Sequence, residues 1–117
     1  MLAVMGAMDE EVTHLRDDMT ITDETVHAGV QVTHGTFKGA DIALAQCGIG
    51  KVNATICTQM LIDLYKPESM LFSGVAGGLM PNMQVGDIII ASHLIQYDMA
   101  LTAFGRRHGE LPGRDRM

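Results

Sequence analysis

Hydrophobic residues follow two patterns in the first part of this chain: short unbroken runs, and runs at helical spacing. The first run, "LAVM" at residues 2–5, ends at Gly6 and is typical of a buried strand. From Asp9 the pattern changes to one apolar residue every three or four positions, at Val12, Leu15 and Met19. Acidic residues 9–11 occupy the first turn of this segment, where they suit the positive end of a helix dipole. We therefore predict a strand over 2–5 and a helix beginning at Asp9.

The segment "VQVTHGTFKGADIALAQC", residues 30–47, has the pattern of a β-hairpin. Val30 and Val32 alternate with polar residues, and residues 42–45 form a second apolar run. Lys38-Gly39 lies between the two runs and is a suitable two-residue turn. We predict two antiparallel strands here.

A second helix is predicted by "KVNATICTQMLIDLYK", residues 51–66, which follows the glycines of "GIG" and ends before Pro67. Its apolar stripe consists of Val52, Ile56, Met60, Leu61 and Leu64. After it we expect a buried strand at 70–73 and a longer apolar strand at 88–95, and beyond Asp98 the pattern fades.

Buried strands separated by a helix indicate a layered α/β architecture in which some strands are parallel. The hairpin makes the predicted sheet mixed. No helix follows residues 88–95 to cover that strand, and a sheet covered on one face only would expose a large apolar surface. We therefore expect residues 1–117 to be one part of a single domain that is apparently truncated.

The composition narrows the classes of protein to which the chain can belong. Its 117 residues fit one small domain, and 47% hydrophobic with 19% charged residues is typical of a folded rather than a disordered chain. The net charge of −6 argues against a nucleic-acid or anionic-membrane surface. The apolar runs are too short to span a bilayer, and the first residues lack the features of a secretory signal. We expect a cytoplasmic protein.

Cysteine and histidine residues give no sign of a metal site. Cys47 and Cys57 lack metal-ligand spacing and lie in apolar surroundings, so we predict reduced, buried core thiols. The five histidines also lack ligand spacing, and we expect neither a metal nor another cofactor.

Glycine-rich loops follow three of the predicted strands: "GAMDEEV" at 6–12, "CGIGKV" at 47–52 and "SGVAGGL" at 73–79. Ligands of open α/β sheets bind beyond the carboxyl ends of the strands. None of the three loops matches a phosphate-binding loop or a dinucleotide-binding fingerprint. Glycine after a strand is also common in ordinary turns, so each loop alone leaves both interpretations open.

Taken in order, these loops with "VGDIIIA" at 85–91, "YDMALTAFG" at 97–105 and "LPG" at 111–113 resemble the 5′-methylthioadenosine/S-adenosylhomocysteine nucleosidases. These are hydrolases of the nucleoside phosphorylase superfamily. The resemblance extends over essentially the whole chain but covers only the amino-terminal half of the family's usual domain. It implies a three-layer α/β/α fold with a mixed central sheet, and hydrolysis of the N-glycosidic bond of both nucleosides to adenine and the thioribose product. It also implies a homodimer that needs no cofactor.

The resemblance implies roles for individual residues. Glu11 would be the catalytic residue that binds and polarises the water nucleophile. The nucleoside pocket would be lined by Met8, Ile49, Val75, Ala76 and Gly77, with the glycine loop approaching the purine and ribose where a Cβ would collide. At the dimer interface, Leu101, Phe104 and Pro112 would reach toward the partner's alkylthio pocket. Without the resemblance, Glu11 is an ordinary acid of a helix first turn, and Met8 and Ile49 are ordinary core residues.

The chemistry of the first loop favours a hydrolase over a phosphorylase. By resemblance, phosphorylases hold phosphate at this position, and phosphate binding needs cationic donors. "GAMDEEV" supplies three acids and no arginine, so we expect water to be the nucleophile.

The chain departs from the family pattern at three points, two of which bear on activity, whereas the departure at Ala100 has no assigned effect. Val75 stands where many relatives have serine, so the water would depend more heavily on Glu11, and Ala100 stands where relatives often carry an acid. The family's general acid and its ribose-binding glutamate belong to the carboxyl-terminal half, and neither Asp87 nor Asp98 substitutes for them. Two alternatives therefore stay open: a non-catalytic remnant of this fold, and a hydrolase of another purine nucleoside.

Overall fold

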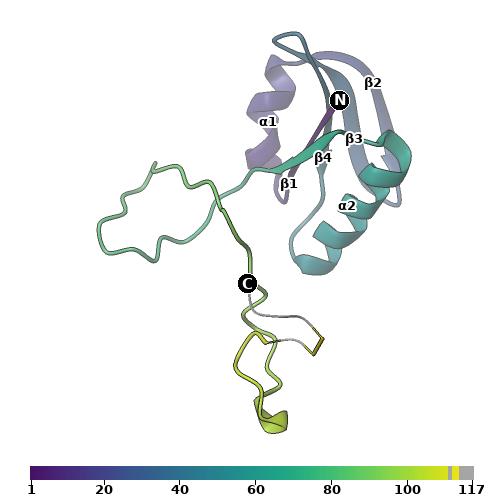
Figure 1. The fold of residues 1–117 in the computed structure, drawn as a ribbon. Coiled ribbons are helices and arrows are strands. Elements are labelled where there is room, and N and C mark those ends of the chain that lie inside the picture. The colour runs from purple at the N-terminus through teal and green to yellow at the C-terminus, as the bar shows by residue number, and fades with distance from the viewer. Residues whose placement is uncertain (111, 114–117) are drawn as a thin grey trace. The chain divides into compact units, whose positions relative to one another are not determined.

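The computed structural model describes residues 1–110 and 112–113, in two compact units. The first unit, residues 1–77, contains β1 (Leu2–Gly6), α1 (Asp9–Asp18), β2 (Thr20–His27), β3 (Val30–Phe37), β4 (Ala40–Gln46), α2 (Lys51–Tyr65) and β5 (Ser69–Phe72) (Figure 1). In the described part of the second unit, which begins at Gly78, the one regular element is the short 3₁₀ helix η1 (Thr102–Phe104). Among the described residues, no helix combines the length and the apolar character that crossing a membrane requires.

The sheet of the first unit has five strands in the order β2-β3-β4-β1-β5. β1 pairs in parallel with β4 on one side and with β5 on the other. β3 pairs antiparallel with both β2 and β4, so the predicted mixed sheet is confirmed. Because β4, β1 and β5 run in the same direction, their carboxyl ends lie at one edge of the sheet.

Two-residue turns join the antiparallel strands. Lys38 and Gly39 have φ angles of 48° and 82°, the left-handed values that a type I′ turn needs at both positions, and the predicted hairpin is confirmed. Ala28 and Gly29, with φ angles of 49° and 80°, connect β2 to β3 in the same way. β2 was not predicted, because "TITDETVH" is mostly polar and exposed, as an edge strand allows. Its β-branched residues and the Ala28-Gly29 pair were the available signal.

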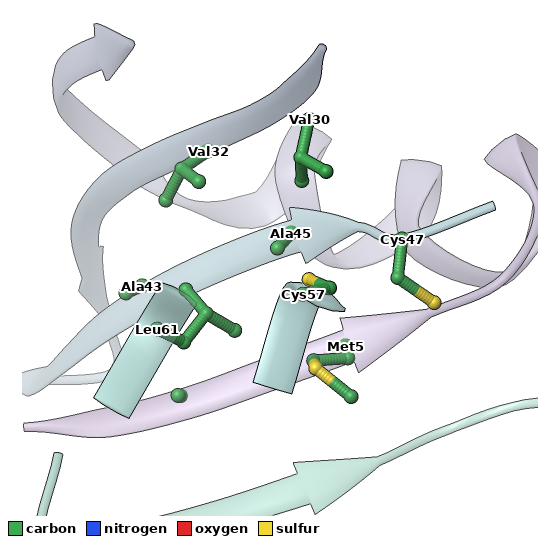
Figure 2. Packing of buried hydrophobic residues seen from close by; sticks show 9 residues of the cluster. Met5, Val30, Val32, Ala43, Ala45, Cys47, Cys57 and Leu61 are labelled. Carbon is green, nitrogen blue, oxygen red and sulfur yellow. The ribbon is translucent and has the colours of Figure 1, made fainter. Parts of the chain in front are cut away.

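Helices cover both faces of this sheet. On one face, Cys57 and Leu61 of α2 are fully buried against a cluster of residues from β1, β3 and β4 (Figure 2). The other buried members of this cluster are Ala3, Met5, Val30, Val32, Ala43, Ala45 and Cys47. On the opposite face, the second buried cluster consists of Val4, Val12, Met19, Ile42 and Leu44. Successive residues of β1 thus alternate between the two clusters, and the three-layer α/β/α fold is confirmed.

The predicted apolar stripe of α2 is only partly right. Leu61 is buried and Met60 packs against the core, but Val52, Ile56 and Leu64 are 73%, 49% and 53% exposed. These three residues and Met60 form a row at i, i+4 spacing beside the row that contains Cys57 and Leu61. A helix that lies on a sheet turns only one such row fully inward, and here it is the row of Cys57.

Two predicted strands need correction. β5 ends at Phe72 and is an edge strand, so Leu71 and Phe72 are each 53% exposed rather than buried. The strand predicted at 88–95 is wrong, because this segment contains no helix or strand and Ile88 is 90% exposed. A strand needs a neighbour for its backbone N–H and C=O groups, and no residue that the structure describes pairs with this segment.

The contrast between Leu61 and Leu64 of the same helix provides a test of this packing. We expect Leu61→Ala to lower the free energy of unfolding by about 2–5 kcal/mol, because it leaves a cavity against the sheet. Leu64→Ala should cost less than about 1 kcal/mol, since that side chain is already half exposed. Denaturant unfolding of both variants measures the difference. Equal losses would mean that the two rows of α2 are assigned incorrectly.

Candidate functional site

The three glycine-rich loops lie together at one edge of the sheet. β1 pairs with β4 as far as Gly6 and Gln46, and with β5 as far as Met5 and Phe72. The ladders continue one step into the loops, where Cys47 N–H donates to Gly6 O at 2.9 Å and Ser73 N–H donates to Met5 O at 2.8 Å. The loops after β1, β4 and β5 therefore share the carboxyl edge of the parallel strands.

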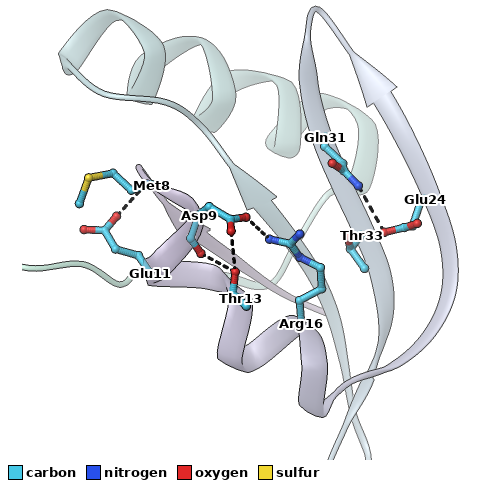
Figure 3. Close-up of polar contacts among 8 residues, drawn as sticks. All are labelled: Met8, Asp9, Glu11, Thr13, Arg16, Glu24, Gln31 and Thr33. Carbon is cyan, nitrogen blue, oxygen red and sulfur yellow. Dashed lines mark hydrogen bonds and ion pairs between the residues drawn. The ribbon is translucent and has the colours of Figure 1, made fainter.

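Glu11 is the side chain that connects two of these loops. It is the third residue of α1, and its Oε2 accepts hydrogen bonds from the backbone N–H groups of Ala7 at 2.7 Å and Met8 at 3.0 Å. Figure 3 shows the bond to Met8, which caps the first turn of the helix. Oε1 accepts a third hydrogen bond, at 3.0 Å, from the backbone N–H of Val75 in the loop after β5. One carboxylate thus joins segments that are 64 residues apart.

These hydrogen bonds also determine the charge of the site. The N–H groups of Val75 and Met8 lower the pKa of Glu11, with a smaller contribution from Ala7, and partial burial opposes them. The side chain is therefore a carboxylate at neutral pH.

The other two acids of the first turn have different surroundings. Asp9 is exposed and accepts a 2.8 Å hydrogen bond from Arg16, which together with Thr13 lowers its pKa (Figure 3). Glu10 is exposed. The interpretation as an ordinary solvated acid therefore fits Asp9 and Glu10. The carboxylate of Glu11, in contrast, is hydrogen-bonded to backbone N–H groups of both loops.

The structure identifies which glycine of the third loop the packing requires. A Cβ on Gly74 would lie 2.7 Å from Glu11 Oε1, so the carboxylate would have to move to make room for any side chain here. A Cβ on Gly6 would likewise lie 2.7 Å from Val12 Cγ1. At Gly77, in contrast, the added atom would meet nothing within 4 Å, and the backbone is outside the left-handed region. The close approach at Gly74 is to the protein's own carboxylate, a contact that the glycine pattern signalled without identifying its partner.

The second loop presents its apolar side chain to solvent. Gly48 and Gly50 have φ angles of 81° and 99°, so both need glycine, and Ile49 between them is 73% exposed. Asn53 Nδ2 donates to Ile49 O at 2.8 Å and holds the loop on the first turn of α2. Met8 is half-buried at the start of α1. The alternative that Ile49 is a core residue is therefore wrong.

The remaining residues of the predicted pocket fall into two groups. Val75, Ala76 and Gly77 are exposed in the loop after β5, at the same edge as Glu11. Leu101 and Phe104 belong to the second unit, where Phe104 N–H donates to Leu101 O at 2.9 Å and Phe104 is 82% exposed. Pro112, also in that unit, is exposed. Leu111, the first residue of the "LPG" motif, lies outside the described residues.

Both cysteines are free and buried, as predicted. Burial raises the pKa of the Cys57 thiol to about 11, and burial together with the charge of Glu11 raises that of Cys47. Within residues 1–110 and 112–113, no group of three or more histidine, cysteine or acidic residues is arranged to hold a metal ion.

Comparison with known proteins places this arrangement in a family. The family model described as the phosphorylase superfamily matches residues 1–117. The 5′-methylthioadenosine/S-adenosylhomocysteine nucleosidase of a Geobacillus species is 41% identical over 112 residues, which make up 96% of this chain and 48% of that protein. The nucleosidase of the same name from Colwellia psychrerythraea, solved in complex with adenine, matches with a TM-score of 0.91 and 38% identity. That match covers 97% of this chain and 47% of the solved one.

A second solved structure carries a different name. The futalosine hydrolase of Helicobacter pylori matches with a TM-score of 0.89 and 32% identity, over 97% of this chain and 49% of that one. The chain spans about half the length of the curated relatives it matches. The resemblance to the nucleosidases is confirmed, and the match over residues 1–117 shows that the chain belongs to the phosphorylase superfamily.

Proposed function

We propose that this chain supplies the amino-terminal part of a hydrolase that cleaves the N-glycosidic bond of 5′-methylthioadenosine and S-adenosylhomocysteine, releasing adenine and the thioribose product. The observation that carries the proposal is the ionised Glu11 carboxylate, held by three backbone N–H groups at the edge where the three loops meet. Glu11 would bind and polarise the attacking water. The names of the relatives support the substrate class.

The charge of the site favours water over phosphate as the nucleophile. Phosphate carries negative charge, and the carboxylate of Glu11 would repel it at close range. Arg16, the one arginine among residues 1–77, is bonded to Asp9. A water molecule can donate a hydrogen bond to Glu11 without such a penalty.

The nucleoside would lie against the loops of the carboxyl edge. Met8, Ile49, Val75, Ala76 and Gly77 would line its pocket, and the exposed apolar side chains of Ile49 and Val75 suit contact with a purine or ribose face. The bound adenine of the Colwellia psychrerythraea structure supports a site for this base. No cofactor is needed for hydrolysis, and the reaction uses only acid–base chemistry and water.

The assembled enzyme would contain more than this chain. We propose that residues 1–117 form the amino-terminal part of a single nucleosidase domain, and that the general acid comes from the other half. Two such domains would form a cytoplasmic homodimer, with Leu101, Phe104 and Pro112 at the interface. The high exposure of Phe104 within its unit supports a contact there.

A second candidate is a hydrolase of another purine nucleoside. The similarity to the Helicobacter pylori futalosine hydrolase favours keeping it, because that protein matches with nearly the same TM-score. The third possibility is a non-catalytic remnant, which the following experiment separates from both enzymes.

The first test is adenine release with and without a carboxyl-terminal half. A fusion of residues 1–117 to that half of the Geobacillus nucleosidase should release adenine from methylthioadenosine at the same rate with or without phosphate. The 117-residue chain alone should be slower by at least about 10²-fold, because general acid catalysis is worth about 10²–10⁴-fold. A rate that rises with phosphate would indicate a phosphorylase. A folded fusion that cleaves another purine nucleoside but not methylthioadenosine would indicate the second candidate, and one that cleaves neither would indicate the remnant.

The second test is Gly77→Ala in the same fusion. The fold should tolerate it within about 0.5 kcal/mol, because the backbone conformation is ordinary and the space around it is open. If the nucleoside lies against this backbone, the new Cβ should weaken binding of an adenosine analogue by about tenfold or more. Melting temperature and calorimetric affinity are measured on one preparation. Unchanged affinity would remove Gly77 from the proposed pocket.

A further inference from the structure

The carboxylate of Glu11 serves two loops at once. Oε2 accepts from Ala7 and Met8 at the start of α1, and Oε1 accepts from Val75 in the loop after β5. The loop after β5 is no longer paired with the sheet at Val75, because β5 ends at Phe72 and Ser73 makes the last hydrogen bond to β1. Val75 is 81% exposed, so packing contributes little to its position.

We propose that Glu11 is a positioning residue for the nucleoside pocket: its carboxylate fastens the backbone of Val75 to the first turn of α1 and so presets the loop against which the nucleoside lies. This inference rests on the proposed function and adds a role that is separate from handling water. The pocket-facing segment 75–77 is then ordered before a ligand arrives, and less binding free energy is spent on ordering it.

The fastening requires a carboxylate rather than an amide. Three N–H donors from two segments converge on two oxygens, and both oxygens must accept. Glutamine has one acceptor oxygen and one NH₂ donor. Whichever way its amide turns, the NH₂ faces either Val75 N–H or the pair of N–H groups at Ala7 and Met8.

Gly74 provides a second way to disturb the same contact. A Cβ at this position would lie 2.7 Å from Oε1 and 3.1 Å from Cδ of Glu11. Gly74→Ala therefore displaces the carboxylate from Val75 N–H but keeps Glu11 in the chain. The backbone at Gly74 is outside the left-handed region, so alanine introduces no conformational strain of its own.

The fastening should depend on the ionisation of Glu11. Its pKa is lowered in the folded chain, so the contact is complete at neutral pH and is lost as the pH falls through a value below the ordinary 4.5. The titratable neighbours are Asp9 and Glu10 on the same helix and the buried Cys47 thiol at the end of β4. β1 and the loop segment 73–77 carry no titratable side chain.

The first experiment is an NMR titration of backbone amides in the 117-residue chain. The amide protons of Ala7, Met8 and Val75 should shift together with one midpoint below pH 4.5. Glu11→Gln should abolish this shared titration, and the matched control Glu10→Gln should preserve it. Independent titration of Val75, or a shared titration that persists in Glu11→Gln, would overturn the proposal.

Hydrogen exchange at neutral pH tests the same contact without acidification. Loss of a hydrogen bond to a charged group should speed exchange of the Val75 amide by about 10- to 100-fold in both Glu11→Gln and Gly74→Ala. Glu10→Gln should leave the rate unchanged. Retained protection in both disturbed variants, each folded by circular dichroism, would contradict the fastening.

Ligand affinity in the fusion separates this inference from the proposed function. Gly74→Ala should weaken binding of an adenosine analogue by about tenfold, because the loop must then be ordered at the cost of binding. If Gly74→Ala binds the analogue as tightly as the parent does, the positioning role is wrong, whereas the proposed function as a hydrolase still stands. If the parent binds no adenosine analogue, the proposed function fails, whereas the fastening itself is still decided by the shared titration.

Discussion

The position of β1 is the constraint on which the rest of this unit depends. β1 is the second strand from one edge of the sheet and pairs in parallel with both neighbours, β4 and β5. Parallel pairing brings three carboxyl ends, and therefore three loops, to a single edge. Side chains along β1 point alternately to the two faces of the sheet and so contribute to both buried clusters. Ala3 and Met5 pack under α2, whereas Val4 packs with Val12 of α1. The candidate site and both buried clusters thus depend on the same strand, β1.

The loops at this edge are organised around an unusual way of satisfying a carboxylate. Glu11 has no cationic partner among its described hydrogen bonds, and three backbone N–H groups stabilise it instead. The backbone N–H groups lower its pKa without cancelling its charge, so this edge of the sheet keeps a negatively charged group at neutral pH. Gly74 leaves room for this arrangement, since a larger residue would force the carboxylate of Glu11 to move.

Much of this fold could be predicted from local pattern. The strand at 2–5, the helix from Asp9, the Lys38-Gly39 hairpin and the helix from residue 51 are all present, because each is determined by periodicity or turn chemistry within a short window. β2 was missed because an exposed edge strand needs no apolar face. The strand predicted at 88–95 was wrong because strand formation depends on a partner that local sequence does not supply.

The candidate site was predictable in kind but not in detail. The three loops were identified from glycines after strands, and their shared edge followed from parallel pairing. The bond between Glu11 and Val75 joins residues 64 positions apart, so no local pattern could reveal it. For the same reason the steric requirement for glycine at Gly74, next to the carboxylate, could not be foreseen, and the close approach of a ligand to Gly77, where space is open, stays a prediction.

We propose that Glu11 directs water, not phosphate, to the glycosidic carbon. The most direct measurement is the mass of the sugar product when the fusion enzyme turns over methylthioadenosine in water enriched in heavy oxygen, with phosphate present. We expect a free thioribose that carries one heavy oxygen atom. A sugar phosphate without the label would contradict it.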